Sequence, residues 1–234
     1  MKKLKKFLSL ISPALILTAC GDGGVTISKP AAPIAWVLCL DNTNSVKPEN
    51  YIMMRDIMIP RLVLSHMKQN DTLNVSECSD QTADKVKMFS AEVAKTQFRQ
   101  RILDFYQQSI STIAQRKTQA TDLLGGISLA ARIGKMEALN HTPRRIELFV
   151  FTDGLAEGRQ SPMSEPLPSD ARVYFVGIEP ENEAGLKNWI KNTAQLTEDQ
   201  AQVVRFSEWE NFIKPFQEIS HRKQNPLLSS LAAK

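Results

Sequence analysis

The sequence predicts an α/β fold in which helices flank both faces of a doubly wound, mainly parallel sheet. Ile34 to Leu40 is an unbroken apolar run, which is typical of a strand buried on both faces. Ile146 to Phe151 predicts a second buried strand in the other half of the chain. Strand and helix patterns alternate around these two segments, as expected for a parallel sheet. With 234 residues and 42% hydrophobic content, the chain can form one such domain with a substantial core.

The part of the chain between these two strands is expected to form three helices and two further strands. Pro48-Glu49-Asn50 favours a helix start, because Pro fits the first turn and Glu the positive end of the helix dipole. Apolar spacing extends this helix through Lys68, with a bend at Pro60. The same kinds of pattern predict a strand at Asp71 to Cys78, a short edge strand at Lys85 to Ala91, and helices at Gln97 to Ala114 and Leu123 to Met136.

A long loop and a second set of alternating elements follow the strand at residues 146–151. Gly154 to Asp170 contains three prolines and exceeds the usual length of a connection, so it is either part of a ligand surface or a mobile insertion. Residues 34–222 are expected to form the domain, and residues 223–234 a flexible tail. The remaining predicted elements are a strand at Arg172 to Ile178, a helix at Glu183 to Leu196, a strand at Ala201 to Phe206 and a closing helix from Ser207.

The first twenty residues have the pattern of a segment that is removed during export. Four lysines precede an apolar stretch from Phe7 to Leu17, which is too short to span a membrane comfortably. Leu17-Thr18-Ala19-Cys20 then resembles a bacterial lipobox. This resemblance implies a lipoprotein signal peptide at residues 1–19 and a lipid anchor on Cys20, followed by a linker through residue 33. An ordinary secretory signal with an unmodified Cys20 is the alternative.

By the same resemblance, the domain is expected in the bacterial cell envelope, anchored to a membrane and facing the periplasm. Gly21, the residue after Cys20, is not the Asp-type signal for retention in the inner membrane, so the outer membrane is favoured.

The charge of the chain gives no indication of nucleic-acid binding. The sequence has 29 Lys and Arg and 25 Asp and Glu, and four of the lysines lie in the first twenty residues, which contain no acid. The remainder therefore carries 25 basic and 25 acidic residues, and no stripe of basic residues interleaved with aromatics occurs in it. We expect no nucleic-acid partner.

Oxygen-bearing side chains follow the two buried strands and precede one helix. Asp41, Thr43 and Ser45 come directly after the first strand, Thr121 precedes the helix at residue 123, and Asp153 follows the strand at 146–151. In a parallel sheet, ligands bind beyond the carboxyl ends of the strands. Carboxylates and hydroxyls at such a place suit a hard divalent cation. The alternative is that the two acids cap helices and the hydroxyls satisfy turn amides.

This combination resembles the metal-ion-dependent adhesion site of von Willebrand factor A (vWA) domains, written D-x-[ST]-x-S with a distant Thr and a distant Asp. The resemblance covers about residues 34–220 and implies the vWA strand order. It also implies that Thr43 and Ser45 coordinate a cation directly, Thr121 directly or through water, and Asp41 and Asp153 largely through water. The expected ion is Mg²⁺, with Mn²⁺ or Ca²⁺ as alternatives.

The function implied by the resemblance is metal-dependent binding of a protein partner. Two carboxylates and three hydroxyls leave a coordination position open and the ion under-neutralised, so an acidic residue of a partner can complete the sphere. The first alternative is a metal-independent assembly or scaffold subunit with a vestigial site.

An enzyme, for example a metal-dependent hydrolase, is less favoured. Thr43 stands where a dehalogenase-type phosphatase needs a second acid, there is no G-x-S-x-G elbow, and no His or Glu is placed to activate water. We therefore expect no catalytic residues.

Cys39 and Cys78 lie in or near strands that the vWA topology makes neighbours. An oxidising compartment permits a disulfide between them, but bridging adjacent strands demands specific geometry. A buried apolar Cys39 and an independent Cys78 remain the alternative.

Overall fold

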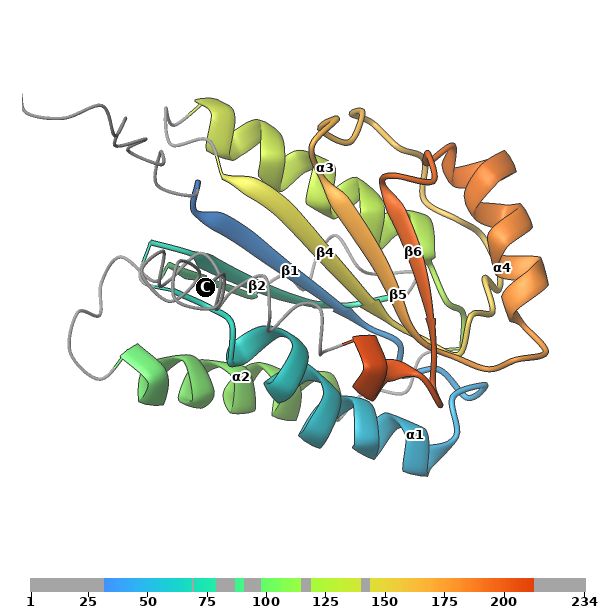
Figure 1. Ribbon diagram of the computed structural model, residues 1–234, viewed down its shortest axis with the longest axis horizontal. Coiled ribbons are helices and arrows are strands. Elements are labelled where there is room, and N and C mark those ends of the chain that lie inside the picture. Colours follow the sequence, from blue (N-terminus) through green and yellow to red (C-terminus); the bar gives the residue numbers. More distant parts are fainter. Residues whose placement is uncertain are drawn as a thin grey trace, which may run out of the picture. The chain divides into compact units, whose positions relative to one another are not determined.

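A six-stranded sheet forms the centre of the described part of the chain (Figure 1). The computed structural model describes residues 32–68, 70–78, 87–90, 98–114, 119–139 and 144–212. Contacts along the chain separate Met1–Ala31 from the unit that begins at Ala32. The predicted signal peptide, Cys20, most of the linker and the tail at 223–234 therefore lie outside the described residues. Among the described helices, none is long and apolar enough to cross a membrane.

The strand order is β3-β2-β1-β4-β5-β6, as in a doubly wound fold. Five strands are parallel to their neighbours, and the edge strand β3 is antiparallel to β2. The predicted fold class and the edge position of the third strand are thereby confirmed. The strands are β1 (Ile34–Leu40), β2 (Thr72–Glu77), β3 (Lys87–Ser90), β4 (Arg145–Phe151), β5 (Arg172–Ile178) and β6 (Ala201–Arg205).

Strand order reverses between β1 and β4, and this position fixes the place of the candidate site. The chain leaves β1 towards β2 on one side, whereas β4 leads to β5 on the other side. The register pairs Leu40 with Phe151, so both strands end at the same level. Ligands of such sheets bind in the crevice beyond this reversal point. Asp41 and Asp153 follow these two strands, so the topology brings them to one crevice.

Helices cover both faces of the sheet, because successive side chains of a strand point to opposite sides. Trp36, Leu38 and Leu40 of β1 belong to the core that is shared with α1 (Pro48–Met53) and α2 (Phe98–Ala114). Ala35, Val37 and Cys39 face the core that is shared with α3 (Leu123–Leu139) and α4 (Glu183–Trp189). Figure 1 shows α1 and α2 below the sheet and α3 and α4 above it.

The first helix continues past α1 in two wider turns, η1 (Met54–Met58) and η2 (Pro60–Leu64). Ile59 donates its N–H to the Met54 carbonyl, and Ser65 donates to the Pro60 carbonyl, five residues back in each case. Pro60 has no N–H and its ring clashes with the carbonyl four residues earlier, which favours a widened turn over a regular one. The same widening follows α4 at η5 (Ile190–Ala194).

Two buried acids lie away from the site, and one of them joins two strands. Asp71 accepts hydrogen bonds from the Ile34 N–H at 2.8 Å, the Trp36 indole at 2.9 Å and the Lys68 N–H at 2.9 Å, which join the start of β1 to the start of β2. Glu147 interrupts the apolar pattern of β4 and is fully buried, 2.6 Å from the Arg145 guanidinium. Burial raises the pKa of Glu147, and the charge of Arg145 opposes that rise.

Candidate metal centre

The Asp41 carboxylate is the centre of a hydrogen-bonded cluster at the end of β1. Its side chain is fully buried, and its backbone N–H donates to the Phe151 carbonyl at 2.8 Å, which fixes it against β4. Oδ1 accepts the N–H of Thr43 at 3.0 Å and the hydroxyl of Thr43 at 2.7 Å. Oδ2 accepts the hydroxyl of Thr152 at 2.8 Å. Both carboxylate oxygens are thus held in place by the chain itself.

Three hydroxyls adjoin this carboxylate in one continuous group. Thr43 Oγ1 lies 3.0 Å from Ser45 Oγ, and Thr121 Oγ1 lies 3.2 Å from Thr43 Oγ1. Thr121 Oγ1 is also 3.3 Å and 3.4 Å from the two oxygens of Asp41. Thr43 and Thr121 are buried, whereas Ser45 is half-buried. The structure therefore brings together four of the five predicted site residues, from segments about 80 residues apart.

Asp153, the fifth residue, lies beside this group after β4. Its Oδ1 accepts the N–H of Leu155 at 3.1 Å, and its carbonyl accepts the Glu179 N–H at 3.2 Å and the Asn182 side-chain amide at 3.0 Å. The side chain is 3% exposed. Its negative charge is close enough to Asp41 to raise the pKa of that carboxyl.

The electrostatics of the cluster favour an added positive charge. Burial is the main cause that raises the pKa of Asp41 from 3.8 to about 6, and the Asp153 charge adds to it. Hydrogen bonds from Thr43 and Thr152 oppose this rise. Within the described residues, no Lys or Arg forms an ion pair with either acid. A cation in the crevice would offset the cost of the buried charge.

The donor set fits a hard divalent cation. Oxygen ligands suit Mg²⁺, Mn²⁺ or Ca²⁺, and hydroxyls leave much of the positive charge uncompensated. In the described part of the chain, no three or more His, Cys, Asp or Glu side chains form a cluster that could hold a metal. The two carboxylates and three hydroxyls therefore supply few charged ligands. Such a set suits an ion that keeps bound water or takes a ligand from another molecule.

Sequence reasoning missed Thr152 as a member of the site. It is fully buried and is the only side chain of the described residues that donates to Oδ2 of Asp41 at less than 3.0 Å. Its hydroxyl also accepts the Gly154 N–H at 3.1 Å. The Thr-Asp-Gly sequence after β4 was the available signal, because the register sets Thr152 opposite Asp41 once β1 and β4 are paired.

The loop at residues 154–170 is attached to the chain around Thr121. Gln160 donates its amide to the Thr121 carbonyl at 2.8 Å and accepts the Leu124 N–H at 3.2 Å. Ser161 donates its N–H to the Asp122 carboxylate at 3.0 Å, and its hydroxyl donates to the same carboxylate. No sequence signal identified these contacts. They favour the interpretation of this loop as part of the site surface over that of a mobile insertion.

Cys39 and Cys78 are both free and fully buried. The possible disulfide between them is therefore absent from this structure, in which Cys39 is paired across the sheet with Ser76 and Cys78 follows β2. The two thiols still interact, and burial followed by this contact raises the pKa of Cys78. Cys39 also packs on α3, where a Cβ at Gly126 would lie 2.8 Å from its sulfur, so this helix position needs glycine.

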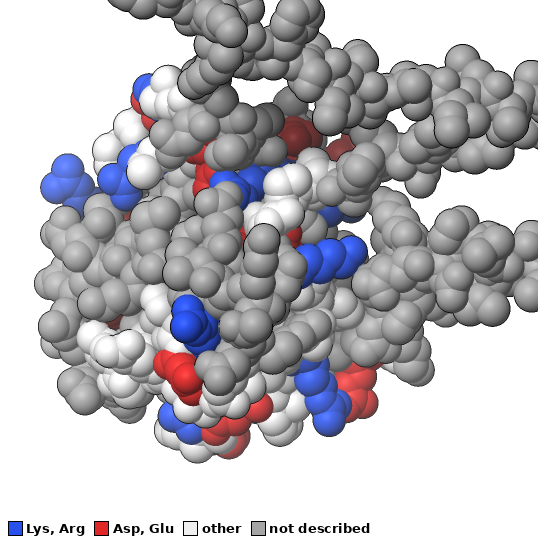
Figure 2. Space-filling model, turned by 90° about the vertical axis from the view of Figure 1, so that its left-hand side faces the viewer, with Lys and Arg blue, Asp and Glu red and all other residues white. Residues whose placement is uncertain are grey.

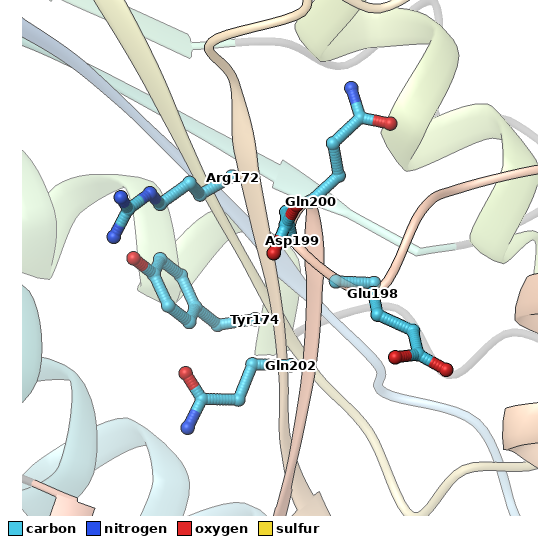
Figure 3. A pocket seen from close by; sticks show the side chains of 7 residues that line it. Arg172, Tyr174, Glu198, Asp199, Gln200 and Gln202 are labelled. Carbon is cyan, nitrogen blue, oxygen red and sulfur yellow. The ribbon is translucent and has the colours of Figure 1, made fainter.

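A polar hollow of about 140 Å³ lies at the opposite end of the sheet, where β5 and β6 begin (Figure 3). The guanidinium of Arg172 lies beside the hydroxyl of Tyr174, with which it forms a hydrogen bond. The carboxylate of Glu198 points away from Tyr174. On the face shown in Figure 2, acidic and basic side chains are interspersed among the described residues.

The comparisons with known proteins identify similar folds. No family model matches the chain, and no curated protein does. A von Willebrand factor type A structure from Catenulispora acidiphila is 13% identical, covering 81% of this chain and 42% of that one, with a TM-score of 0.43. The pilus adhesin SpaC from Lactobacillus rhamnosus GG is 10% identical over 83% of this chain and 31% of its own, with a TM-score of 0.49.

The manganese-loaded TRAP protein of Plasmodium vivax is 13% identical, covering 79% of this chain and 73% of that one, with a TM-score of 0.43. This chain thus spans less than half the length of two of the three structures. The strand order, the five parallel strands and the flanking helices by themselves give the protein a doubly wound α/β fold.

Proposed function

We propose that this protein binds a divalent cation through Asp41, Thr43, Ser45, Thr121 and Asp153, and that the bound cation captures an acidic residue of a protein partner. The observation that carries the proposal is the continuous cluster of one buried carboxylate and three hydroxyls, with Asp153 beside it, at the point where the strand order reverses. Mg²⁺ is the proposed ion, and Mn²⁺ or Ca²⁺ would suit the same oxygens.

The roles of the individual residues follow from their positions. Thr43 and Ser45 would bind the ion directly, Thr121 directly or through water, and the two acids largely through water. The Thr152 hydroxyl and the Thr43 N–H would orient the Asp41 carboxylate through their hydrogen bonds to it, as groups around metal ligands commonly do. The cation would supply a positive charge that the chain only partly neutralises, which favours an additional carboxylate ligand.

The proposed setting is the bacterial cell envelope, where a lipid on Cys20 would hold the domain at a membrane, facing the periplasm. The outer membrane is the favoured location, and an envelope-associated complex is the favoured context. We propose a binding protein and not an enzyme, because His66, the histidine that lies in the described part, follows η2 and not a strand end at the crevice. A metal-independent assembly subunit is the second candidate, and it predicts partner capture that survives removal of divalent cations.

The first test is thermal unfolding of residues 21–234 in Mg²⁺, Mn²⁺, Ca²⁺ or EDTA. An ion present at 100 times its dissociation constant should raise the free energy of unfolding by about 2.7 kcal/mol. Thr121→Ala and Asp153→Ala should remove this gain, whereas Asp170→Ala, at an exposed position of the loop, should keep it. A gain of equal size in all four proteins would contradict cation binding at this site.

The second test concerns the partner. The metal-loaded protein should capture envelope proteins that EDTA releases and that Thr121→Ala does not capture. Capture that is unchanged by EDTA and by the substitution would support the metal-independent assembly subunit instead.

A further inference from the structure

A pocket of about 180 Å³ lies between α3 and the loop at residues 154–170, apart from the proposed cation ligands. The pocket is formed by one stripe of α3 and by a short stretch of the loop. Its lining residues are Gly125, Ser128, Arg132, Ser161, Pro162 and Ser164. This lining contains one positive side chain and three hydroxyls, and no acidic residue.

Arg132 and two of the three hydroxyls of this pocket have no partners in the described part of the chain. No described acid forms an ion pair with Arg132. Glu165, which follows Ser164 in the loop, pairs with Lys135 instead. Within the same described ranges, the hydroxyls of Ser128 and Ser164 make no hydrogen bond. The pocket therefore presents donors that are available to a ligand.

One acid lies near the Gly125 end of the pocket, and its carboxylate accepts hydrogen bonds from the chain. The Asp122 carboxylate, against Gly125, accepts the Gly125 N–H at 2.8 Å as well as the N–H and hydroxyl of Ser161. Arg132 is seven residues further along α3, which is about 10 Å at 1.5 Å per residue. The three hydrogen bonds that Asp122 accepts offset part of its negative charge, and the distance along the helix weakens its repulsion of an anion at the Arg132 end.

We propose that this pocket binds a small oxyanion, a carboxylate or a phosphate monoester, through the Arg132 guanidinium and the hydroxyls of Ser128 and Ser164. A guanidinium can donate two parallel hydrogen bonds to either group, and serine hydroxyls can donate to the remaining oxygens. The hollow in Figure 3 does not share this chemistry, because Glu198 and Asp199 line it. The oxyanion site requires no cation and extends beyond the proposed function.

The two sites are connected through the loop. Ser161 lines the oxyanion pocket and binds Asp122, while the preceding Gln160 binds the Thr121 carbonyl. A segment of a partner with two acidic groups could therefore meet both sites on the same side of the domain. The oxyanion site would then add to the selectivity of a metal-bound contact.

The test is a titration of ¹⁵N-labelled residues 21–234 in EDTA with inorganic phosphate or with acetate, followed by NMR. We expect saturable shifts of the Arg132 Nε–Hε signal and the Ser164 amide signal. Arg132→Gln should weaken binding at least tenfold and Ser164→Ala about threefold. Arg159→Gln, which removes the same charge from an exposed position outside the pocket lining, should bind as the wild type does.

The two anions distinguish the sources of the ligand group. Saturation by phosphate alone would indicate a phosphorylated ligand, and saturation by acetate alone a carboxylate. Shifts that rise linearly with both anions, or that are weakened equally by Arg159→Gln and Arg132→Gln, would overturn the proposal. Because EDTA is present throughout, failure of this test is distinct from failure of cation binding.

Discussion

The buried Asp41 carboxylate should make the free energy of unfolding of the cation-free domain depend on pH. Its pKa is raised from 3.8 to about 6, chiefly because burial disfavours the charged form. When the pKa of a group is higher in the folded state than in the unfolded state, the group stabilises the fold fully at pH values below its unfolded-state pKa. That stabilisation is lost as the pH rises through the folded-state pKa. The difference corresponds to about 3 kcal/mol, at roughly 1.4 kcal/mol per pKa unit.

The measurement is urea unfolding of residues 21–234 in EDTA at pH values from 4 to 8, for the wild type and for Asp41→Asn. Subtracting the two profiles removes the contributions of the other titrating groups. Relative to the variant, the wild type should lose about 2 kcal/mol between pH 4 and pH 7, because part of the total of about 3 kcal/mol is already lost at pH 4. Saturating Mg²⁺ at pH 7 should restore the free energy of unfolding in the wild type and leave the variant unchanged.

Parallel pH profiles for the two proteins would refute the reasoning, because Asp41 would then titrate equally in the folded and unfolded states. Asp170→Asn is the matched control, since Asp170 is an exposed acid of the loop and its substitution should reproduce the wild-type profile.

Three further substitutions test single contacts. Thr152→Val removes a hydrogen bond to Asp41, so by calorimetric titration the cation affinity should fall roughly tenfold or more, as for other groups that orient metal ligands. Gln160→Ala removes the two hydrogen bonds that Gln160 makes with Thr121 and Leu124 and should weaken the same affinity by up to about tenfold. Asp71→Ala removes the acceptor of one buried and two partly buried hydrogen bonds and should lower the free energy of urea unfolding by about 3 kcal/mol.

Each of these substitutions has a matched control of the same residue type. Thr193→Val in η5 and Gln202→Ala in β6 change exposed side chains and should leave the cation affinity unchanged. Asp56→Ala breaks an exposed ion pair and should cost less than about 1 kcal/mol. Equal effects in a substitution and its control would mean that the hydrogen bond in question does not carry the effect.

Much of the fold was predictable because its signals are local. β1 and β5 have the bounds that the apolar runs indicated, and the other described strands and helices differ from the predictions by a few residues at their ends. Glu147 could not be foreseen as buried, because its partner Arg145 becomes a neighbour on the same face only when the strand forms. The wide turns around Pro60 were likewise not predictable. A proline indicates that the helix is irregular at that point, but it does not indicate whether the helix bends, breaks or widens.

The grouping of the five candidate residues was predictable from the sequence, whereas the hydrogen bonds that support them were not. The motif placed Asp41, Thr43 and Ser45 on one turn, and the strand order then brought Thr121 to them. The contacts of Gln160 and Ser161 depend on how a loop of seventeen residues folds back onto α3, and no periodic pattern encodes that path.

The local contacts of the acids separate a ligand role from a capping role. Lys47 is the residue that precedes α1, and no side chain caps that helix, so Asp41 is not a helix cap. Asn182 precedes α4, whereas the Asp153 side chain accepts only the N–H of Leu155 within the described residues.

Asp122 is the acid that does cap a helix, because it accepts the Gly125 N–H in the first turn of α3. That arrangement leaves its neighbour Thr121 facing the Asp41 cluster. A fold that needed caps alone would have no reason to bury the Asp41 carboxylate beside Asp153 without a basic partner, at a cost of about 3 kcal/mol near neutral pH. Under the proposed function, a bound cation would remove that cost, and a carboxylate of the partner would take the open coordination position of the ion.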